Sequence, residues 1–279
     1  MNVLDRWREA LGERVAGLAG QGLPVSGLIV VGFLAVHSKQ MRQTDLKGKV
    51  AVVTGGNSGI GLAIAMPLAQ VGCHIVIGAR NQKRNLVVAD ELHRKGGVRT
   101  LALETDVARE ADCEHLIRET ISKFGTLHIL VNNAGIFGGT VGAKTSSEDF
   151  DRVLKTNLYG AFWCARAAYR QMQENKDNPR GFIINISSVA GKQAWSGTGT
   201  YSASKFGLLG LTHALADEGK ADGIKATAIC PALVATPMTG VSGPDYLQPE
   251  DIAETVLYLL RLSAAAWPTE IVLERKGAD

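Results

Sequence analysis

A tyrosine and a lysine four positions apart, Tyr201 and Lys205, are the residues of this chain best suited to acid–base chemistry. Residues at this spacing lie on the same face of a helix. An ammonium group beside a phenol favours the phenolate, so Tyr201 could release and regain a proton nearer to neutral pH. The same spacing also occurs on ordinary solvated helix faces, so the pair by itself does not establish a site.

A glycine-rich segment, Thr54-Gly-Gly-Asn-Ser-Gly-Ile-Gly61, follows a short apolar run and opens a helical pattern. Glycines let the backbone turn tightly beside a pyrophosphate, and the N-terminus of the following helix attracts its negative charge. The spacing G-x-x-x-G-x-G differs from the general dinucleotide fingerprint. The segment predicts a nucleotide site, and a strand–helix turn that binds nothing is the alternative.

These two segments occur together with Asn132-Asn-Ala-Gly135, Asn157 and Ser188, in an order that chance does not explain. In this combination the chain resembles the short-chain dehydrogenase/reductase family from about Asp45 to the C-terminus. The resemblance implies an oxidoreductase with a single-domain α/β Rossmann fold. This fold is a doubly wound parallel sheet of about seven strands with helices on both faces.

The resemblance also implies a catalytic tetrad of Asn157, Ser188, Tyr201 and Lys205. The interval from Ser188 to Tyr201 matches that of the family, so Ser187 is the less suitable serine. Tyr201 would exchange a proton with the substrate oxygen, and Ser188 would hydrogen-bond that oxygen. Lys205 would lower the pKa of Tyr201 and bind the nicotinamide ribose. Asn157 would hold a water beside Lys205.

By the same resemblance, a dinucleotide would contact the glycine-rich segment, the ends of the later strands and a nicotinamide loop. The residues concerned are Gly55, Asn57, Ser58, Gly59, Ile60, Gly61, Arg80, Asp106, Val107, Asn133, Ala134, Gly135, Tyr201, Lys205, Pro231, Val234 and Thr236. Asp106 would contact the adenine amino group, and Thr236 would bind the carboxamide. Ala232 stands where the nicotinamide loop of the family usually has glycine.

The end of the second predicted strand bears on the choice between NAD and NADP. The segment Gly78-Ala-Arg-Asn81 carries no carboxylate for the ribose 2′-hydroxyl, whereas Arg80 can pair with a 2′-phosphate. Ser58 stands where some NADP-dependent members carry a second basic residue. We expect NADP(H) as the cofactor, with NAD(H) as the alternative.

Four apolar residues near the predicted strand ends, Phe137, Trp195, Met238 and Val241, could line an apolar substrate pocket. Trp195 could equally pack against the main fold. We expect the substrate to contact Ser188, Trp195 and Tyr201. The main hypothesis is hydride transfer between NADP(H) and a carbonyl or secondary alcohol. The alternatives are an NAD-dependent alcohol or sugar dehydrogenase and a dinucleotide-sensing protein without turnover.

Alternating strand and helix patterns must position these residues, as in a parallel sheet covered on both faces. The predicted strands are Val50–Val53, His74–Gly78, Thr100–Glu104, His128–Val131, Phe182–Ile186, Lys225–Ile229 and Glu270–Leu273. The predicted helices are Ile60–Val71, Lys83–Lys95, Glu110–Phe124, Glu148–Asn175, Ser202–Asp222 and Pro249–Leu262. Pro67 lies inside the first helix and predicts a kink there.

Composition and charge limit the possible partners and compartment. The net charge is only +3, and the basic residues are scattered, so nucleic acid is not expected as a partner. The four cysteines lack C-x-x-C spacing, which argues against a zinc site and fits a reducing compartment with buried thiols. We therefore expect a cytoplasmic protein without a metal.

An N-terminal extension, residues 1–44, precedes the predicted catalytic domain, residues 45–279. It combines an amphipathic helix pattern with an apolar run at 23–36 that is shorter than a transmembrane helix requires. The extension could pack against protein or make a weak membrane contact. Large apolar residues on two predicted helices also predict self-association, for which the resemblance implies a homodimer or homotetramer. They are Leu158, Phe162, Trp163, Leu208, Leu209 and Leu211.

Overall fold

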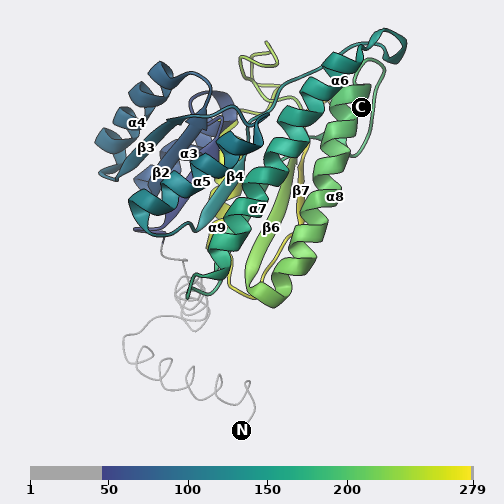
Figure 1. Ribbon diagram of the computed structural model, residues 1–279. Helices are drawn as coiled ribbons and strands as arrows, with labels where there is room; N and C mark the ends of the chain where they lie inside the picture. Colours follow the sequence, from purple (N-terminus) through teal and green to yellow (C-terminus); the bar gives the residue numbers. More distant parts are fainter. Residues whose placement is uncertain (1–45, 278–279) are drawn as a thin grey trace, which may run out of the picture. The chain divides into compact units, whose positions relative to one another are not determined.

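Short apolar segments of the chain form one seven-stranded parallel sheet with the order β3-β2-β1-β4-β5-β6-β7 (Figure 1). The computed structural model describes residues 46–277, so the expected N-terminal extension lies outside the described residues. Every residue of β1, β4, β5 and β6 is buried, as expected for parallel strands covered on both faces. The strands are β1 Val50–Thr54, β2 His74–Ala79, β3 Thr100–Glu104, β4 Ile129–Asn132, β5 Gly181–Ile186, β6 Ile224–Pro231 and β7 Glu270–Leu273.

Helices cover both faces of the sheet. Helices α5, α7 and α8 lie in front of it in Figure 1, and α3 and α9 lie behind it. The helices are α3 Gly59–Gln70, α4 Gln82–Gly96, α5 Glu110–Phe124, α6 Ser147–Leu154, α7 Gly160–Gln173, α8 Gly199–Asp222 and α9 Pro249–Arg261. Within residues 46–277, no helix is both long and apolar enough to cross a membrane. The predicted fold class is confirmed.

One predicted helix differs from the structure in a way that matters for the site. The sequence predicts continuous α-helix from Glu148 to Asn175, but a π-helical turn, η2 (Lys155–Tyr159), separates α6 from α7. Such turns contain one residue more than an α-helical turn and often occur at functional sites. Helix α3 continues past Pro67 to Gln70, so this proline lies in its last turn. All four cysteines are buried and free, as predicted.

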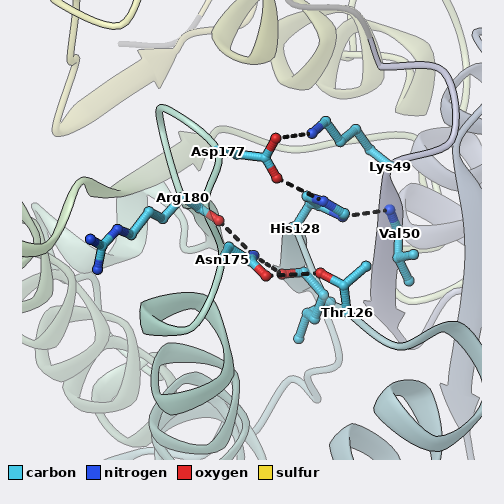
Figure 2. A network of polar contacts seen from close by, with 8 residues as sticks. Lys49, Val50, Thr126, His128, Asn175, Asp177 and Arg180 are labelled. Atoms are coloured by element: carbon cyan, nitrogen blue, oxygen red, sulfur yellow. Dashed lines mark hydrogen bonds and ion pairs between the residues drawn. The ribbon is translucent and has the colours of Figure 1, made fainter.

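A polar network holds together the edge of the sheet at which the strands begin (Figure 2). His128 Nδ1 accepts a hydrogen bond from the Val50 amide at 3.0 Å, and its Nε2 lies 3.1 Å from the Asp177 carboxylate. Lys49 also binds Asp177, at 2.7 Å. Burial, followed by the charge of Lys49, lowers the pKa of His128. His128 is therefore a neutral structural imidazole that joins β1 to the segment before β5.

Candidate active site

A cavity of about 840 Å³ lies at the opposite edge, where the strands end. It brings together most of the residues that the sequence nominates for a dinucleotide and for catalysis. They are Gly55, Asn57, Ser58, Gly59, Ile60, Arg80, Asp106, Val107, Asn133, Ala134, Gly135, Ser188, Tyr201, Lys205, Pro231, Val234 and Thr236. Strand order reverses between β1 and β4 in this sheet, and such a switch point is where α/β proteins bind ligands.

The glycine-rich segment between β1 and α3 forms a cradle that admits no side chains at two positions. Gly55 has φ 65°, and a Cβ there would lie 2.9 Å from the Asn133 amide nitrogen. A Cβ at Gly61 would collide with the Gly55 carbonyl oxygen. The Ser58 side chain does not cap α3, so the amides of its first turn are available to an anionic ligand. The cradle therefore fits a pyrophosphate.

Asn133 braces this cradle from the end of β4. Its side-chain amide donates to the carbonyl oxygens of Thr54 at 2.9 Å and Gly55 at 3.3 Å. The Thr54 hydroxyl in turn accepts from the backbone amides of Asn133 and Ala134. These bonds hold the ends of β1 and β4 side by side.

The acid–base residues meet above β5. Ser188 follows this strand and lies close enough to Tyr201 to affect its pKa; Tyr201 lies on α8 one turn before Lys205. The Lys205 ammonium lies 5.6 Å from the centre of the Tyr201 ring and donates to the Ile186 carbonyl oxygen at 2.8 Å. Ser187 points elsewhere, since its hydroxyl donates to the Lys205 carbonyl oxygen. A proton donor, an oxygen-binding hydroxyl and a cation thus share one wall of the cavity.

Burial shifts the pKa values of this pair in opposite directions. The pKa of Lys205 falls from 10.5 to about 8 because its ammonium is desolvated. Burial also raises the pKa of Tyr201, and the Ser188 side chain opposes that rise only in part. The sequence predicts that Lys205 lowers the pKa of Tyr201, but in the protein without bound dinucleotide the causes of the shift are burial and Ser188. The Lys205 ammonium is bonded instead to the Ile186 carbonyl oxygen.

Asn157 reaches the site from the π-helical turn and is fully buried. Its side chain exchanges two hydrogen bonds with the backbone of Ile136, at 2.8 and 2.9 Å. It also donates to the Ser204 hydroxyl at 3.1 Å, and Ser204 donates to the Tyr201 carbonyl oxygen at 2.6 Å. Asn157 thus connects the loop after β4 with the first turns of α8.

The end of β2 carries the positive charge that the sequence predicts. The cavity is lined there by Gly78, Ala79, Arg80, Asn81, Gln82 and Lys83, with no carboxylate among them. Lys83, at the start of α4, was not among the nominated residues. The sequence contains one indication that Lys83 acts with Arg80, namely their spacing of three residues. This spacing brings them near each other because α4 begins at Gln82. Glu104, at the end of β3, also lines the cavity and was not nominated.

The expected substrate pocket is only partly assembled. The Phe137 and Tyr201 rings lie 5.2 Å apart, and Met238 lines the cavity. Phe137, Trp195 and Val241 do not line it. The Trp195 side chain is 45% exposed, and its backbone is held by the Thr198 hydroxyl. The prediction that Trp195 contacts substrate therefore has no support from the cavity, because the turn before α8 leaves this ring outside it.

The chain is similar to known oxidoreductases over most of its length. Residues 49–246 match the family model described as short chain dehydrogenase. A 3-oxoacyl-[acyl-carrier-protein] reductase of Synechocystis is 36% identical over 81% of this chain and 94% of its own. A 3-oxoacyl-[acyl-carrier-protein] reductase of Staphylococcus aureus is 34% identical over 76% of this chain and 90% of its own.

A solved structure has the same arrangement of elements. An alcohol dehydrogenase from the archaeon Thermococcus sibiricus, complexed with 5-hydroxy-NADP, is 28% identical and superposes with a TM-score of 0.76. The superposition covers 83% of this chain and 97% of the archaeal one. The family match, the sheet order and the glycine cradle agree with one another. The chain belongs to the short-chain dehydrogenase family of nucleotide-binding oxidoreductases.

Proposed function

We propose that the protein is an NADP(H)-dependent reductase of an apolar carbonyl compound, or a dehydrogenase of the corresponding secondary alcohol. One observation carries the proposal: Ser188, Tyr201 and Lys205 line the same cavity as the glycine cradle and Arg80. A protein that only senses dinucleotides has no need of a buried lysine beside a tyrosine–serine pair. This arrangement therefore favours turnover.

NADPH, when bound, supplies the hydride for the carbonyl carbon. Tyr201 donates a proton to the carbonyl oxygen, and Ser188 hydrogen-bonds the same oxygen as negative charge develops on it. The hydroxyl groups of a bound ribose would compete with Ile186 for the Lys205 ammonium. In the oxidative direction Tyr201 removes the alcohol proton instead. Asn157 supports this arrangement by holding the turn of α8 that carries Tyr201, and we infer that it also holds a water of a proton relay beside Lys205.

The preference for NADP(H) over NAD(H) rests on the end of β2. Arg80 and Lys83 line the cavity there, and the segment contains no carboxylate that could accept a ribose 2′-hydroxyl. The 5-hydroxy-NADP of the archaeal relative agrees with this choice. An NAD-dependent enzyme of the same family is the alternative.

The substrate class rests on the apolar side chains near Tyr201 and in the cavity, and on the relatives. Phe137 is 52% exposed beside Tyr201, and Met238 is 54% exposed. Exposed apolar side chains around a catalytic group suit an apolar carbonyl substrate. Two relatives are named as 3-oxoacyl reductases, so 3-oxoacyl thioesters and bulky ketones are the first compounds to test.

Steady-state kinetics with such a panel tests the proposal. NADPH oxidation is followed by absorbance, with NADH in parallel and with Tyr201→Phe and Tyr258→Phe as variants. Tyr258 lies on α9, is 55% exposed and does not line the cavity, so its variant is the matched control. We expect Tyr201→Phe to lower kcat by about 10²-fold or more and Tyr258→Phe to leave it unchanged. Equal activity of Tyr201→Phe and the wild type would contradict the assignment of Tyr201.

We also infer that the protein self-associates through the helices beside the site. Leu208 and Leu209, which the sequence nominates for this contact, belong instead to the core. Three aromatic side chains of this region are exposed, namely Tyr159 (44%), Phe162 (40%) and Phe206 (46%). Light scattering at micromolar concentration tests the inference, and a monomeric mass would contradict it.

A further inference from the structure

A buried asparagine on α4, Asn85, connects three separate segments that line the cavity. It is fully buried, and its amide nitrogen lies 2.7 Å from the Ala79 carbonyl oxygen at the end of β2. The same nitrogen lies 3.0 Å from the Leu103 carbonyl oxygen near the end of β3. Its oxygen accepts a hydrogen bond of 2.7 Å from the Asn57 side chain in the glycine cradle. One side chain therefore links β2, β3 and the cradle.

The neighbouring residue adds a second connection to the same point. Arg84 donates from Nε to the Asn57 carbonyl oxygen at 2.7 Å. Asn57 is thus held by α4 twice, through its side chain and through its backbone. The first turn of α4 also carries Lys83 and begins two residues after Arg80, and these two cations line the cavity at the end of β2. The connection to Asn57 therefore sets the position of these cations relative to the cradle.

The chemistry of a buried amide explains why an apolar residue would not serve here. Asparagine is less favourable than leucine inside a helix, and its burial is tolerated only when its polar atoms are paired. Asn85 satisfies its own donors and acceptor within the three segments. Its removal leaves the buried Asn57 amide without this partner, which permits the cradle and the first turn of α4 to move apart.

We infer that Asn85 is a positioning residue for the adenosine end of the dinucleotide, acting through Asn57 to hold Arg80 and Lys83 at the ribose 2′-phosphate. The inference rests on the proposed NADP(H) dependence. Asn85 does not line the cavity, so its effect is indirect. Because only NADPH carries the 2′-phosphate, loss of this connection weakens NADPH binding more than NADH binding.

Fluorescence titration of the full chain with NADPH and NADH tests the inference on Asn57→Ala, Asn85→Ala and the double variant. We expect Asn85→Ala to weaken NADPH binding about 10-fold, which is the size of effect expected for the loss of one buried hydrogen-bond network. NADH binding should weaken by less than about 3-fold. At saturating NADPH, the kcat of Asn85→Ala should remain unchanged. The double variant should bind NADPH no more weakly than the weaker single variant, because both changes break the same connection.

Asn175→Ala is the matched control, because it also removes an asparagine side chain that hydrogen-bonds separate segments, here by three bonds and at the opposite edge of the sheet (Figure 2). It should lower stability without changing NADPH affinity. If Asn85→Ala lowers the melting temperature as Asn175→Ala does and leaves NADPH affinity unchanged, Asn85 is merely structural and the inference is wrong. Additive losses of affinity in the double variant would also overturn it.

Arg84 provides a second test that does not disturb the core, because its side chain is exposed. Arg84→Lys keeps the charge but changes the group that binds Asn57, and it should weaken NADPH binding as Arg84→Ala does. Full affinity in Arg84→Lys would show that charge alone acts at this position and would contradict the connection. A wild-type chain that binds NADH but not NADPH would refute the proposed cofactor and this inference together. Unchanged NADPH affinity in Asn85→Ala would refute the inference alone.

Discussion

The buried ammonium of Lys205 should make the unliganded protein less stable than a variant without this charge. Burial lowers the pKa of Lys205 from 10.5 to about 8. A difference of this size corresponds to about 3 kcal/mol of unfavourable free energy for the charged form. The hydrogen bond to the Ile186 carbonyl oxygen returns about 1 kcal/mol. Lys205→Met keeps an unbranched side chain only one atom shorter, so it should raise the free energy of unfolding by about 2 kcal/mol at pH 7.

The pH dependence of this gain follows from the two pKa values. Below about pH 8, Lys205 is charged in both the folded and the unfolded chain, and the full penalty applies. Between about 8 and 10.5 the unfolded chain binds more protons than the folded chain, so the stability of the wild type rises with pH. The advantage of Lys205→Met should therefore shrink across this interval and vanish near its upper end.

Urea unfolding without dinucleotide at pH 7 and at pH 10 measures this difference. Thermal unfolding at pH 7 should show a melting temperature about 4–8 °C higher for Lys205→Met. Lys220→Met is the matched control, because this lysine is exposed on the same helix, and its effect should stay within about 0.5 kcal/mol. A Lys205→Met variant that is less stable than the wild type at pH 7, or whose advantage is equal at both pH values, would refute the reasoning.

Two further changes test the cradle and the cofactor site. Gly61→Ala should lower stability by about 1–3 kcal/mol and weaken dinucleotide binding, since its Cβ would meet the Gly55 carbonyl oxygen. Gly210→Ala, in an exposed and open position of α8, should instead stabilise by about 0.5–1 kcal/mol, and urea unfolding compares the two. Arg80→Asp should reverse the preference for NADPH over NADH in kcat/KM, because a carboxylate accepts the ribose 2′-hydroxyl and repels the 2′-phosphate. An unchanged preference would contradict the role of Arg80.

Features that depend on local pattern were predictable from the sequence. The buried strands appear as apolar runs, and the bounds of β3, β7 and α5 agree with the predicted ones. Asn133 directly follows β4 and Ser188 stands two residues after β5, so the topology of a parallel sheet brings them to one edge.

Features that depend on partners distant in the chain were not predictable. The side chain of Asn157, in the π-helical turn, hydrogen-bonds Ile136 and Ser204. Neither partner can be recognised from the helical pattern of the sequence. The low pKa of Lys205 likewise arises from burial that only the assembled fold provides. The role of Asn85 was not predictable either, because one polar residue in an amphipathic helix is ordinary until its surroundings are known.

The π-helical turn also restricts how the length of this part of the chain can change. Residues 155–159 contain one residue more than the surrounding α-helical geometry needs. Deleting one residue there would leave a regular helix with complete backbone hydrogen bonding. It would also rotate the residues on one side by about 100° relative to those on the other. Asn157 would then turn away from Ser204, although the fold and its core could survive. A single-codon deletion in this turn is therefore a route by which a relative could keep the architecture and lose the tetrad.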